Sequence, residues 1–320
     1  MLIGHAEQSA TFRAAFASGS MHHAWLLTGP PGVGKGSFAR AAAAWVLALA
    51  AGPAVDDTTL DLPSSHPTVP IIAAGGHPDY RILQRTTDDK GKLRTVIRID
   101  EIRALQPLFR NTPALSPWRV VIVDSADEMN RNAANALLKN LEEPPAGTLF
   151  LVVSHSPGRL LPTIRSRCRT LRFQPLSETE VSIVLAEVRP ELPAGEVAAL
   201  ARVAGGAPGR ALQLAEAGVE TMESDLAALA VARGGEATAR ALALAKSLAG
   251  KTATARYEAF LDLAPAYIAN AAQHRTDGRL GRAISAWERA NDLSASAVAL
   301  SLEPQSVAFE LAMLVAALAD

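Results

Sequence analysis

The chain has a single cysteine and lacks the long apolar run of a membrane protein. Cys168, alone among 320 residues, excludes an intramolecular disulfide framework and a cysteine-rich metal site, and it suits a reducing compartment. The apolar stretch 41–51 is too short to span a bilayer, and residues 1–5 lack the basic and apolar regions of a signal peptide. We therefore predict a cytoplasmic protein without membrane contact.

Neither sign of charge dominates the sequence. The chain carries 31 Lys and Arg against 32 Asp and Glu, which gives a net charge of -1 and a pI near 6.7. There is then no overall positive field to attract nucleic acid, so any DNA contact must come from local patches, and we expect protein partners. With 49% hydrophobic residues, the chain can bury a substantial core and is long enough for two or three domains.

The most informative feature that is present is a nearly complete phosphate loop, Gly-Pro-Pro-Gly-Val-Gly-Lys, at residues 29–35. Its candidate cofactor-binding residues are Gly29, Gly32, Gly34 and Lys35. Such a loop cradles phosphates with backbone N–H groups at a helix N-terminus, and its lysine reaches the outer phosphates. Gly36 stands where a Ser or Thr hydroxyl would bind Mg²⁺, and Ser37 lies about 100° further around the helix. The sequence predicts a phosphate cradle without its metal ligand.

A second departure from an active ATPase concerns the general base. Val120–Asp124 is a β-branched run that ends in an acid, as in a buried strand that delivers a carboxylate to Mg²⁺. Asp124 is therefore a further candidate cofactor-binding residue. Ser125 follows it where a glutamate would activate water, and an ordinary hydroxyl is a poor base. Asp127 and Glu128 come too late in the sequence to be taken as substitutes.

The order of elements predicts an α/β domain followed by helices. Strands are expected at 24–28, 81–83, 96–99, 120–124 and 149–153. A helix is expected over Ser37–Leu49, a second is capped by Asp100, and a third begins after the cap Asn130 and ends at Leu141. Residues 52–76 are rich in proline and predict an irregular excursion.

The C-terminal half carries helix signals only. Ser177–Glu180 has the form of a capping box, and residues 205–209 interrupt the helices that follow it. From about Glu220 onward the chain is rich in alanine and leucine without strand signals, which predicts a separate helical domain.

Two segments resemble the sliding-clamp-loader branch of the AAA+ ATPases: Leu-Leu-Lys-Asn-Leu-Glu-Glu-Pro-Pro at 137–145 and Leu-Pro-Thr-Ile-Arg-Ser-Arg-Cys at 161–168. Bacterial loaders contain motor subunits with intact ATPase motifs and delta-prime-type subunits with degraded ones. Gly36 and Ser125 make this chain similar to the second type. Residues 300–310 also look like the final helix of that type, so the resemblance covers essentially the whole chain.

The resemblance implies an α/β plus all-α fold in three parts. These are a RecA-like AAA+ domain at 1–175, a three-helix lid at 176–219 and a helical collar at 220–320 that holds a five-subunit assembly together. It implies motor subunits of the gamma/tau type and a delta subunit as partners, with the sliding clamp and primed DNA reached through the complex. Function would then be that of a non-hydrolysing scaffold in DNA polymerase III, not an enzyme by itself.

The resemblance also assigns roles to single residues. Arg167 matches the arginine finger that the family inserts into a neighbouring subunit's ATP site, although a surface ion pair is the structural alternative. Arg210 matches the lid arginine that senses nucleotide in relatives, and here a structural ion pair is an equal alternative. Ser154 and His155 occupy the place of the residue that senses the γ-phosphate, and capping is the alternative role.

The sequence also bears on whether the chain holds a metal and whether it contacts DNA directly. Many relatives carry a four-cysteine zinc module after the phosphate-loop helix, but residues 52–76 contain no cysteine, so zinc is predicted absent. The less favoured alternative is a metal held by Asp61, His66, His77 and Asp79. Cys168 is assigned no chemistry. Phosphate-backbone contacts are a hypothesis for Arg94, Arg98, Arg103, Arg131 and Lys139.

Two other functions remain open from the sequence. The chain could be an active AAA+ ATPase, either a divergent motor subunit or a repair protein, that uses Lys35, Asp124 and a rescued metal ligand such as Ser37. It could also be a small-metabolite kinase, which would transfer phosphate without partners. For this chain we predict that ATP binding is weak or absent, and weak binding stays open because the phosphate cradle acts without Mg²⁺.

Overall fold

The computed structural model divides into two compact units. These are Met1–Ile183 with Gly206–Gly209, and Val184–Gly205 with Arg210–Asp320. The structure describes residues 2–50, 52–88, 91, 93–216, 219–250, 253–273, 275–300 and 302–319.

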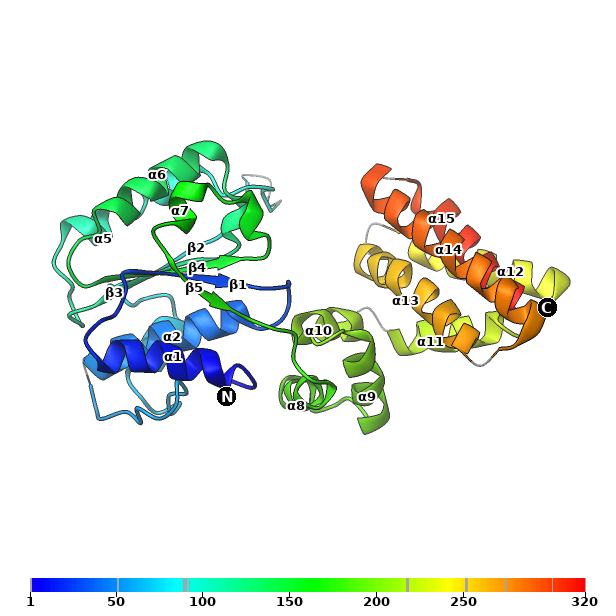
Figure 1. The fold of residues 1–320 in the computed structure, drawn as a ribbon, viewed down its shortest axis with the longest axis horizontal. Coiled ribbons are helices and arrows are strands. Elements are labelled where there is room, and N and C mark those ends of the chain that lie inside the picture. The colour runs from blue at the N-terminus through cyan, green and yellow to red at the C-terminus, as the bar shows by residue number, and fades with distance from the viewer. Residues whose placement is uncertain are drawn as a thin grey trace. The chain divides into compact units, whose positions relative to one another are not determined.

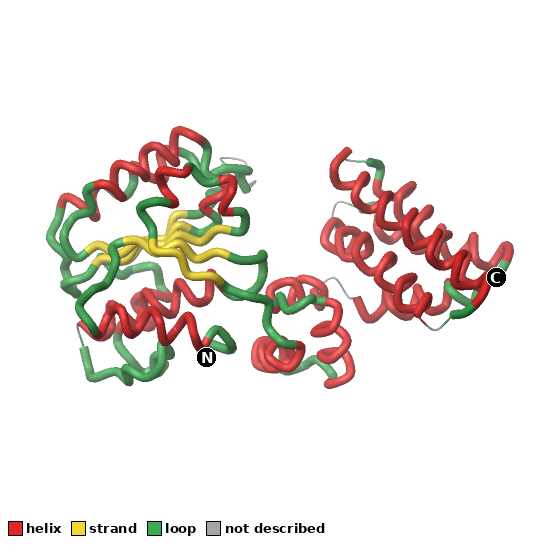
Figure 2. Tube along the Cα trace, in the orientation of Figure 1, coloured by secondary structure: helices red, strands yellow, loops and turns green. Residues whose placement is uncertain are grey.

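The first unit is built on a parallel sheet with helices on both faces (Figures 1 and 2). Its strands are β1 Ala24–Thr28, β2 Tyr80–Leu83, β3 Arg119–Val123, β4 Thr148–Ser154 and β5 Arg169–Arg172. The spatial order is β2-β3-β4-β1-β5, and every pairing is parallel. Its helices are α1 Ala6–Ala17, α2 Lys35–Ala50, α3 Thr68–Ala73, α4 Ile99–Arg103, α5 Gln106–Arg110, α6 Arg131–Glu142 and α7 Pro162–Arg165.

The alternation of side chains along the strands divides the core into two layers. Trp25 and Leu27 of β1 face the cluster formed with α1 and α2. Ala24 and Leu26 of the same strand face the cluster formed with α4, α5, α6 and α7. Residues at β1, β3 and β4 are buried on both faces, which explains their nearly continuous β-branched and leucine runs. The predicted α/β class and the strands 24–28, 120–124 and 149–153 are confirmed.

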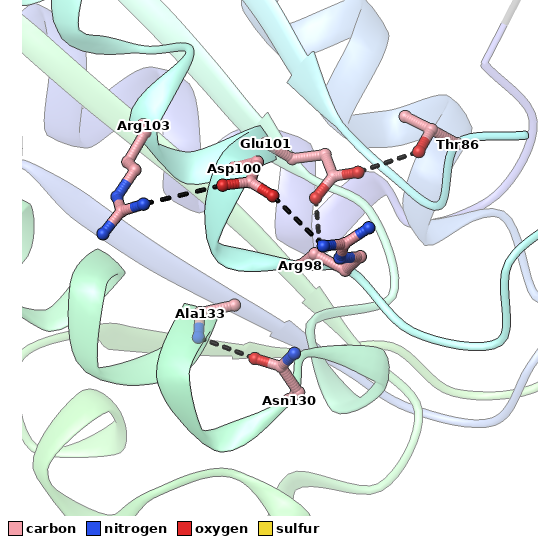
Figure 3. Close-up of polar contacts among 7 residues, drawn as sticks. All are labelled: Thr86, Arg98, Asp100, Glu101, Arg103, Asn130 and Ala133. Carbon is pink, nitrogen blue, oxygen red and sulfur yellow. Dashed lines mark hydrogen bonds and ion pairs between the residues drawn. The ribbon is translucent and has the colours of Figure 1, made fainter. Parts of the chain in front are cut away.

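The helix signals near the sheet are confirmed with one shift. The predicted helix over Ser37–Leu49 lies within α2, and Asn130 caps α6 by accepting a hydrogen bond of 2.8 Å from the Ala133 N–H (Figure 3). The N-cap position of α4 is Arg98 rather than Asp100, so that prediction is wrong. Asp100 lies within the helix and pairs with Arg98 and Arg103 instead.

The reason for the shift is that a different carboxylate satisfies the start of α4. The Arg98 N–H donates to Glu101 at 2.8 Å, and the Thr86 hydroxyl donates to the same carboxylate (Figure 3). The predicted strand over 96–99 is also wrong. Ile97 alone makes an isolated bridge to Met129, because the chain turns into α4 at once.

Among the described residues, the chain from residue 178 onward forms helices and no strands (Figure 2). The helices are α8 Glu178–Val188, α9 Ala194–Val203, α10 Pro208–Glu216, α11 Val219–Leu229, α12 Gly234–Leu248, α13 Thr254–Gln273, α14 Asp277–Leu300 and α15 Pro304–Ala316. The predicted capping box is present, because the Ser177 N–H donates to Glu180 while the Glu180 N–H donates to Ser177. The predicted division into lid and collar near residue 220 stays a prediction.

Helix α15 is the centre of the C-terminal bundle. It packs against α11, α12, α13 and α14, and most of its apolar side chains are buried. The helix begins at Pro304, capped by Glu303, and not at Leu300, which ends α14. The expected 300–310 helix is therefore shifted towards the C-terminus, and Ser301 lies outside the described residues. No helix among the described residues is long and apolar enough to cross a membrane.

Candidate functional site

The phosphate loop lies between β1 and α2 at the carboxyl edge of the sheet. Gly29, Gly32 and Gly34 all have positive φ angles, of 149°, 76° and 105°, which other residues rarely adopt. A Cβ atom on Gly29 would also lie 2.3 Å from the carbonyl oxygen of Phe173. The His5 ring contacts the carbonyl oxygen of Val33 at 2.7 Å and so fixes the middle of the loop. The loop therefore has the positive φ angles that its glycines allow, and phosphate binding by Gly29, Gly32, Gly34 and Lys35 stays a prediction.

Lys35 turns back onto its own loop. Its Nζ donates to the carbonyl oxygens of Gly29 at 2.6 Å and Pro30 at 2.5 Å, and the residue is only 2% exposed. Burial lowers the pKa of Lys35 to about 8, although the charges of Asp127 and Asp124 oppose that shift. The Lys35 ammonium thus lies beside the loop and is hydrogen-bonded only to neutral carbonyl groups, which a phosphate could replace as its partner.

We expect the Lys35 ammonium to titrate near pH 8 in the folded chain. Because its folded pKa lies below the unfolded value, this group lowers stability below about pH 8 and its penalty disappears as the pH rises towards 10.5. The measurement is an NMR titration of ¹³Cε-labelled lysine, with the signal assigned by its loss in Lys35→Met. A midpoint near the ordinary lysine value would contradict the buried position.

The metal side of the site is occupied by an arginine. Arg40 of α2 donates from Nη2 to the Asp124 carboxylate at 2.9 Å. A Cβ atom on Gly36 would lie 2.9 Å from Nη1 of the same guanidinium and 3.8 Å from both Asp124 oxygens. The Arg40 guanidinium therefore occupies the space that a side chain at residue 36 would enter.

The position of the missing base is filled by a serine–histidine contact. Ser125 follows β3 with φ 58° and ψ 58°, and its Oγ lies 3.1 Å from His155 Nε2. Burial and the nearby Lys35 charge lower the pKa of His155, although Asp127 and Asp124 oppose this. Such an imidazole is neutral at pH 7 and hydrogen-bonds a hydroxyl without ionising it.

Asp127 is a site residue that the sequence argument set aside. Its carboxylate accepts hydrogen bonds from the Ser154 hydroxyl at 2.6 Å and from the His155 N–H at 2.5 Å. A 3-10 helix at Ala126–Glu128 turns the chain back on itself and brings Asp127 to the edge of β4. Ser154 and His155 are thus held by capping contacts, and their sensing role stays a prediction.

The residues present fit a phosphate but not a magnesium ion. The loop N–H groups and Lys35 suit the anionic groups of ATP. Residue 36 offers no side-chain oxygen, and Asp124 is already paired with Arg40. A hard cation that requires several oxygen ligands has no adequate donor set at this position.

Arg167 lies at the surface of the first unit, far along the sequence from the phosphate loop at residues 29–35. Its guanidinium pairs with Glu142 at 2.9 Å and donates to the Thr163 carbonyl oxygen at 3.0 Å. Both members of the ion pair are partly exposed. The two motifs that carried the family resemblance thus meet in one contact, because Glu142 ends α6 and Arg167 follows α7.

Arg210 belongs to the second unit. It lies in α10 and pairs with Asp262 of α13 at 2.8 Å. The structure therefore shows the ion pair that the sequence left as an alternative, and the nucleotide-sensing role remains a prediction.

The four residues of the alternative metal site have separate structural roles. Asp61 accepts the Leu2 N–H, and His66 and His77 accept the N–H groups two residues after themselves. The Asp79 carboxylate accepts three backbone N–H groups of the 114–116 turn. Among the described residues no group of three or more His, Cys, Asp or Glu side chains could hold a metal ion. Residues 52–76 are mostly irregular as predicted, with the short helix α3 near their end.

Only two of the five basic residues suggested for DNA contact line a common cavity. Arg103 and Lys139 border a cavity of ≈390 Å³ between α4 and α6, together with three asparagines. Arg98 and Arg103 both pair with Asp100, which partly neutralises their positive charge. DNA contact stays a prediction.

The single cysteine packs against the core layer of α6 and α7. Burial raises the pKa of Cys168 to about 12, so the thiol is inert.

The site contains three contacts that the sequence argument did not name: Arg40 with Asp124, Asp127 with Ser154, and Arg167 with Glu142. Arg40 had a usable signal, because it lies one helical turn after Gly36 and long helical side chains lean towards the N-terminus. The other two depend on how separate segments return to the sheet edge.

Comparison with known proteins gives one family-model match and several curated relatives. The family model described as "DNA polymerase III, delta subunit" matches residues 4–177. DNA polymerase III subunit delta' of Pseudomonas aeruginosa is 38% identical over 208 residues, which cover 64% of this chain and 59% of that protein. The Escherichia coli subunit delta' is 33% identical over 209 residues, or 63% of this chain and 57% of that protein.

Proteins named as gamma or gamma/tau subunits also occur among the relatives. DNA polymerase III subunit gamma of Buchnera aphidicola is 32% identical over 167 residues, or 52% of this chain and 42% of that protein. The chain thus spans less than two thirds of the length of these curated relatives. A solved gamma-subunit-related protein of Thermotoga maritima aligns over 97% of this chain and 98% of its own, with 18% identity and a TM-score of 0.45.

Proposed function

Since the chain belongs to the DNA polymerase III delta-subunit family, we propose that it is a delta-prime-type subunit of a clamp loader. It supports ATP-driven loading of a sliding clamp onto primed DNA without hydrolysing ATP itself. The observation that carries the proposal is the combination at the sheet edge. The metal position holds Arg40 and the base position holds Ser125, while the segment bearing Arg167 is intact.

The partners follow from this role. We expect motor subunits of the gamma/tau type, a delta subunit, and through them the clamp and DNA. The helical residues 220–320 act as a collar and residues 176–219 as a lid in this proposal. A replication role also places the protein in the cytoplasm, where its lone cysteine would stay reduced.

Arg167 is the residue by which this subunit contributes to catalysis. Presented to a neighbouring subunit's ATP, its guanidinium would stabilise the charge that develops on the γ-phosphate. The contact with Glu142 is a resting position for the side chain, because a partly exposed ion pair contributes little stability and exchanges readily for a phosphate.

An active ATPase is the second candidate function, and the retained Lys35 favours it. Its phosphate cradle is complete and its cation lies at the loop. Hydrolysis would nevertheless require a metal ligand other than residue 36 and a base other than residue 125. The Arg40 contact and the neutral Ser125–His155 pair therefore favour the scaffold role.

The purified chain is expected to form a stable complex with gamma/tau-type and delta subunits while showing no ATP turnover alone. Because the collar and not the nucleotide site would hold the assembly, Lys35→Ala should assemble as well as the wild type. Native mass spectrometry measures assembly, and phosphate release measures turnover. A chain that stays monomeric beside both partners would contradict the proposal, as would turnover that Lys35→Ala abolishes.

A further inference from the structure

The strongest unexplained feature of the site is the position of Arg40. Gly36 and Arg40 are four residues apart on α2 and therefore lie on the same face of the helix, one turn apart. Long helical side chains lean towards the N-terminus, so Arg40 extends over Gly36 towards the end of β3. There it meets the Asp124 carboxylate at 2.9 Å.

The contact depends on the absence of a side chain at residue 36. A Cβ atom there would lie only 2.9 Å from Arg40 Nη1, closer than non-bonded atoms normally approach. The same position is 3.8 Å from both oxygens of Asp124. Gly36 is thus doubly suited to this arrangement, because it provides no metal ligand and leaves room for the guanidinium.

We infer that Arg40 takes the place of the metal ion, so that this phosphate loop excludes Mg²⁺ and binds any nucleotide or phosphate without it. The guanidinium neutralises Asp124 as a metal would, and its remaining N–H groups are donors suited to phosphate oxygens. A covalently attached cation offers no ligand-exchange sites for water or for phosphate oxygens. The loop becomes a metal-independent anion site.

A plain surface ion pair is the competing explanation. The Arg40 and Asp124 side chains are 46% and 23% exposed, so the pair contributes little to stability. Stability measurements would not separate the two explanations. Metal dependence does, because only the proposed role predicts that removal of Arg40 and addition of a hydroxyl at residue 36 create a Mg²⁺ response.

The test compares ATP binding by calorimetry in excess Mg²⁺ and in EDTA, with the isolated full chain. The variants are Gly36→Ser, Arg40→Ala and the double variant. Arg85→Ala is the matched control, because Arg85 makes an equally short pair with Glu128 in the same unit. Gly36→Ser is structurally tolerable, since the atom it approaches is the mobile end of Arg40.

Wild type and Arg85→Ala are expected to bind ATP no more tightly with Mg²⁺ than with EDTA, or not to bind in either buffer. The double variant should gain about tenfold or more in affinity from Mg²⁺. Mg²⁺-dependent binding by the wild type would overturn the inference, and so would a folded double variant without a Mg²⁺ response. If the double variant fails to fold, Mn²⁺-induced broadening of the Asp124 amide signal replaces it: broadening in Arg40→Ala but not in the wild type supports the inference, and equal effects overturn it.

The inference deepens the proposed non-hydrolysing role and rests on the same loop. Its experiment uses the chain without partners, whereas the native mass spectrometry of the complex depends neither on Mg²⁺ binding by this chain nor on mutation of Arg40. A failed metal response with intact assembly would therefore leave the scaffold role standing, and failed assembly with the expected metal response would leave the metal-free site standing.

Discussion

Replacement of Arg167 by alanine is expected to lower ATP turnover at the neighbouring subunit's site by ~10³-fold, and so to lower the turnover of the reconstituted complex, while leaving the chain folded and assembled. The size of the effect follows from the transition state, in which negative charge spreads over the oxygens of the transferred phosphoryl group. A guanidinium supplied by the neighbouring subunit stabilises that charge. Its loss in the ground state costs little, because its contact with Glu142 is partly exposed.

The measurement is the steady-state ATPase of the assembled complex with clamp and primed DNA present. Arg165→Ala is the matched control, since Arg165 is an exposed arginine two residues before the partly exposed Arg167 in the same segment. Arg167→Lys keeps a positive charge but loses the bidentate fork, so its turnover should fall between those of alanine and wild type. Glu142→Gln removes the resting contact and should leave turnover near the wild-type level.

Unchanged turnover in an assembled Arg167→Ala complex would contradict the finger. Equal losses in Arg165→Ala and Arg167→Ala would also contradict it, because they would indicate a disturbed surface rather than a specific cation. Loss of assembly in Arg167→Ala alone would assign the residue to an interface instead.

The strands of the central sheet were predictable because their burial on both faces leaves a direct mark in sequence. β1, β3 and β4 each contain an uninterrupted apolar run with polar residues only at the strand ends, and each was expected within one residue of its ends. The segment 96–99 carries a similar β-branched pattern but forms one bridge only. Its residue Ile97 is buried in the core layer that contains α6. The apolar pattern therefore indicated a buried segment, but this segment is not a strand.

The candidate site was predictable where it depends on neighbours in sequence. The loop glycines and Lys35 follow one another in the sequence, and their positive φ angles are ones that glycine adopts readily. Asp127 could not be placed, because a 3-10 turn determines whether it faces the site or solvent. The Arg167 contact depends on α6 and α7 ending near each other, which only the packed fold provides.

Replacement of Asp79 by alanine is expected to lower the free energy of unfolding by about 3 kcal/mol, because a carboxylate that satisfies several backbone donors is lost. Asp79 is 2% exposed and accepts hydrogen bonds from the N–H groups of Ala114, Leu115 and Ser116, at 2.7, 2.7 and 3.1 Å. These residues form the turn that leads into β3. Their donors would be left without a partner, and the Ser116 donor would be left buried.

The measurement is urea unfolding of the full chain, and Asp56→Ala is the matched control. Asp56 also accepts a backbone N–H, from Thr58 at 2.8 Å, but on an exposed turn where water replaces the lost acceptor, so its effect should be much smaller. EDTA should leave the wild-type unfolding curve unchanged. Destabilisation of the wild type by EDTA to the level of Asp79→Ala would instead make Asp79 a metal ligand, and equal effects of the two alanine variants would remove the special role of the buried turn.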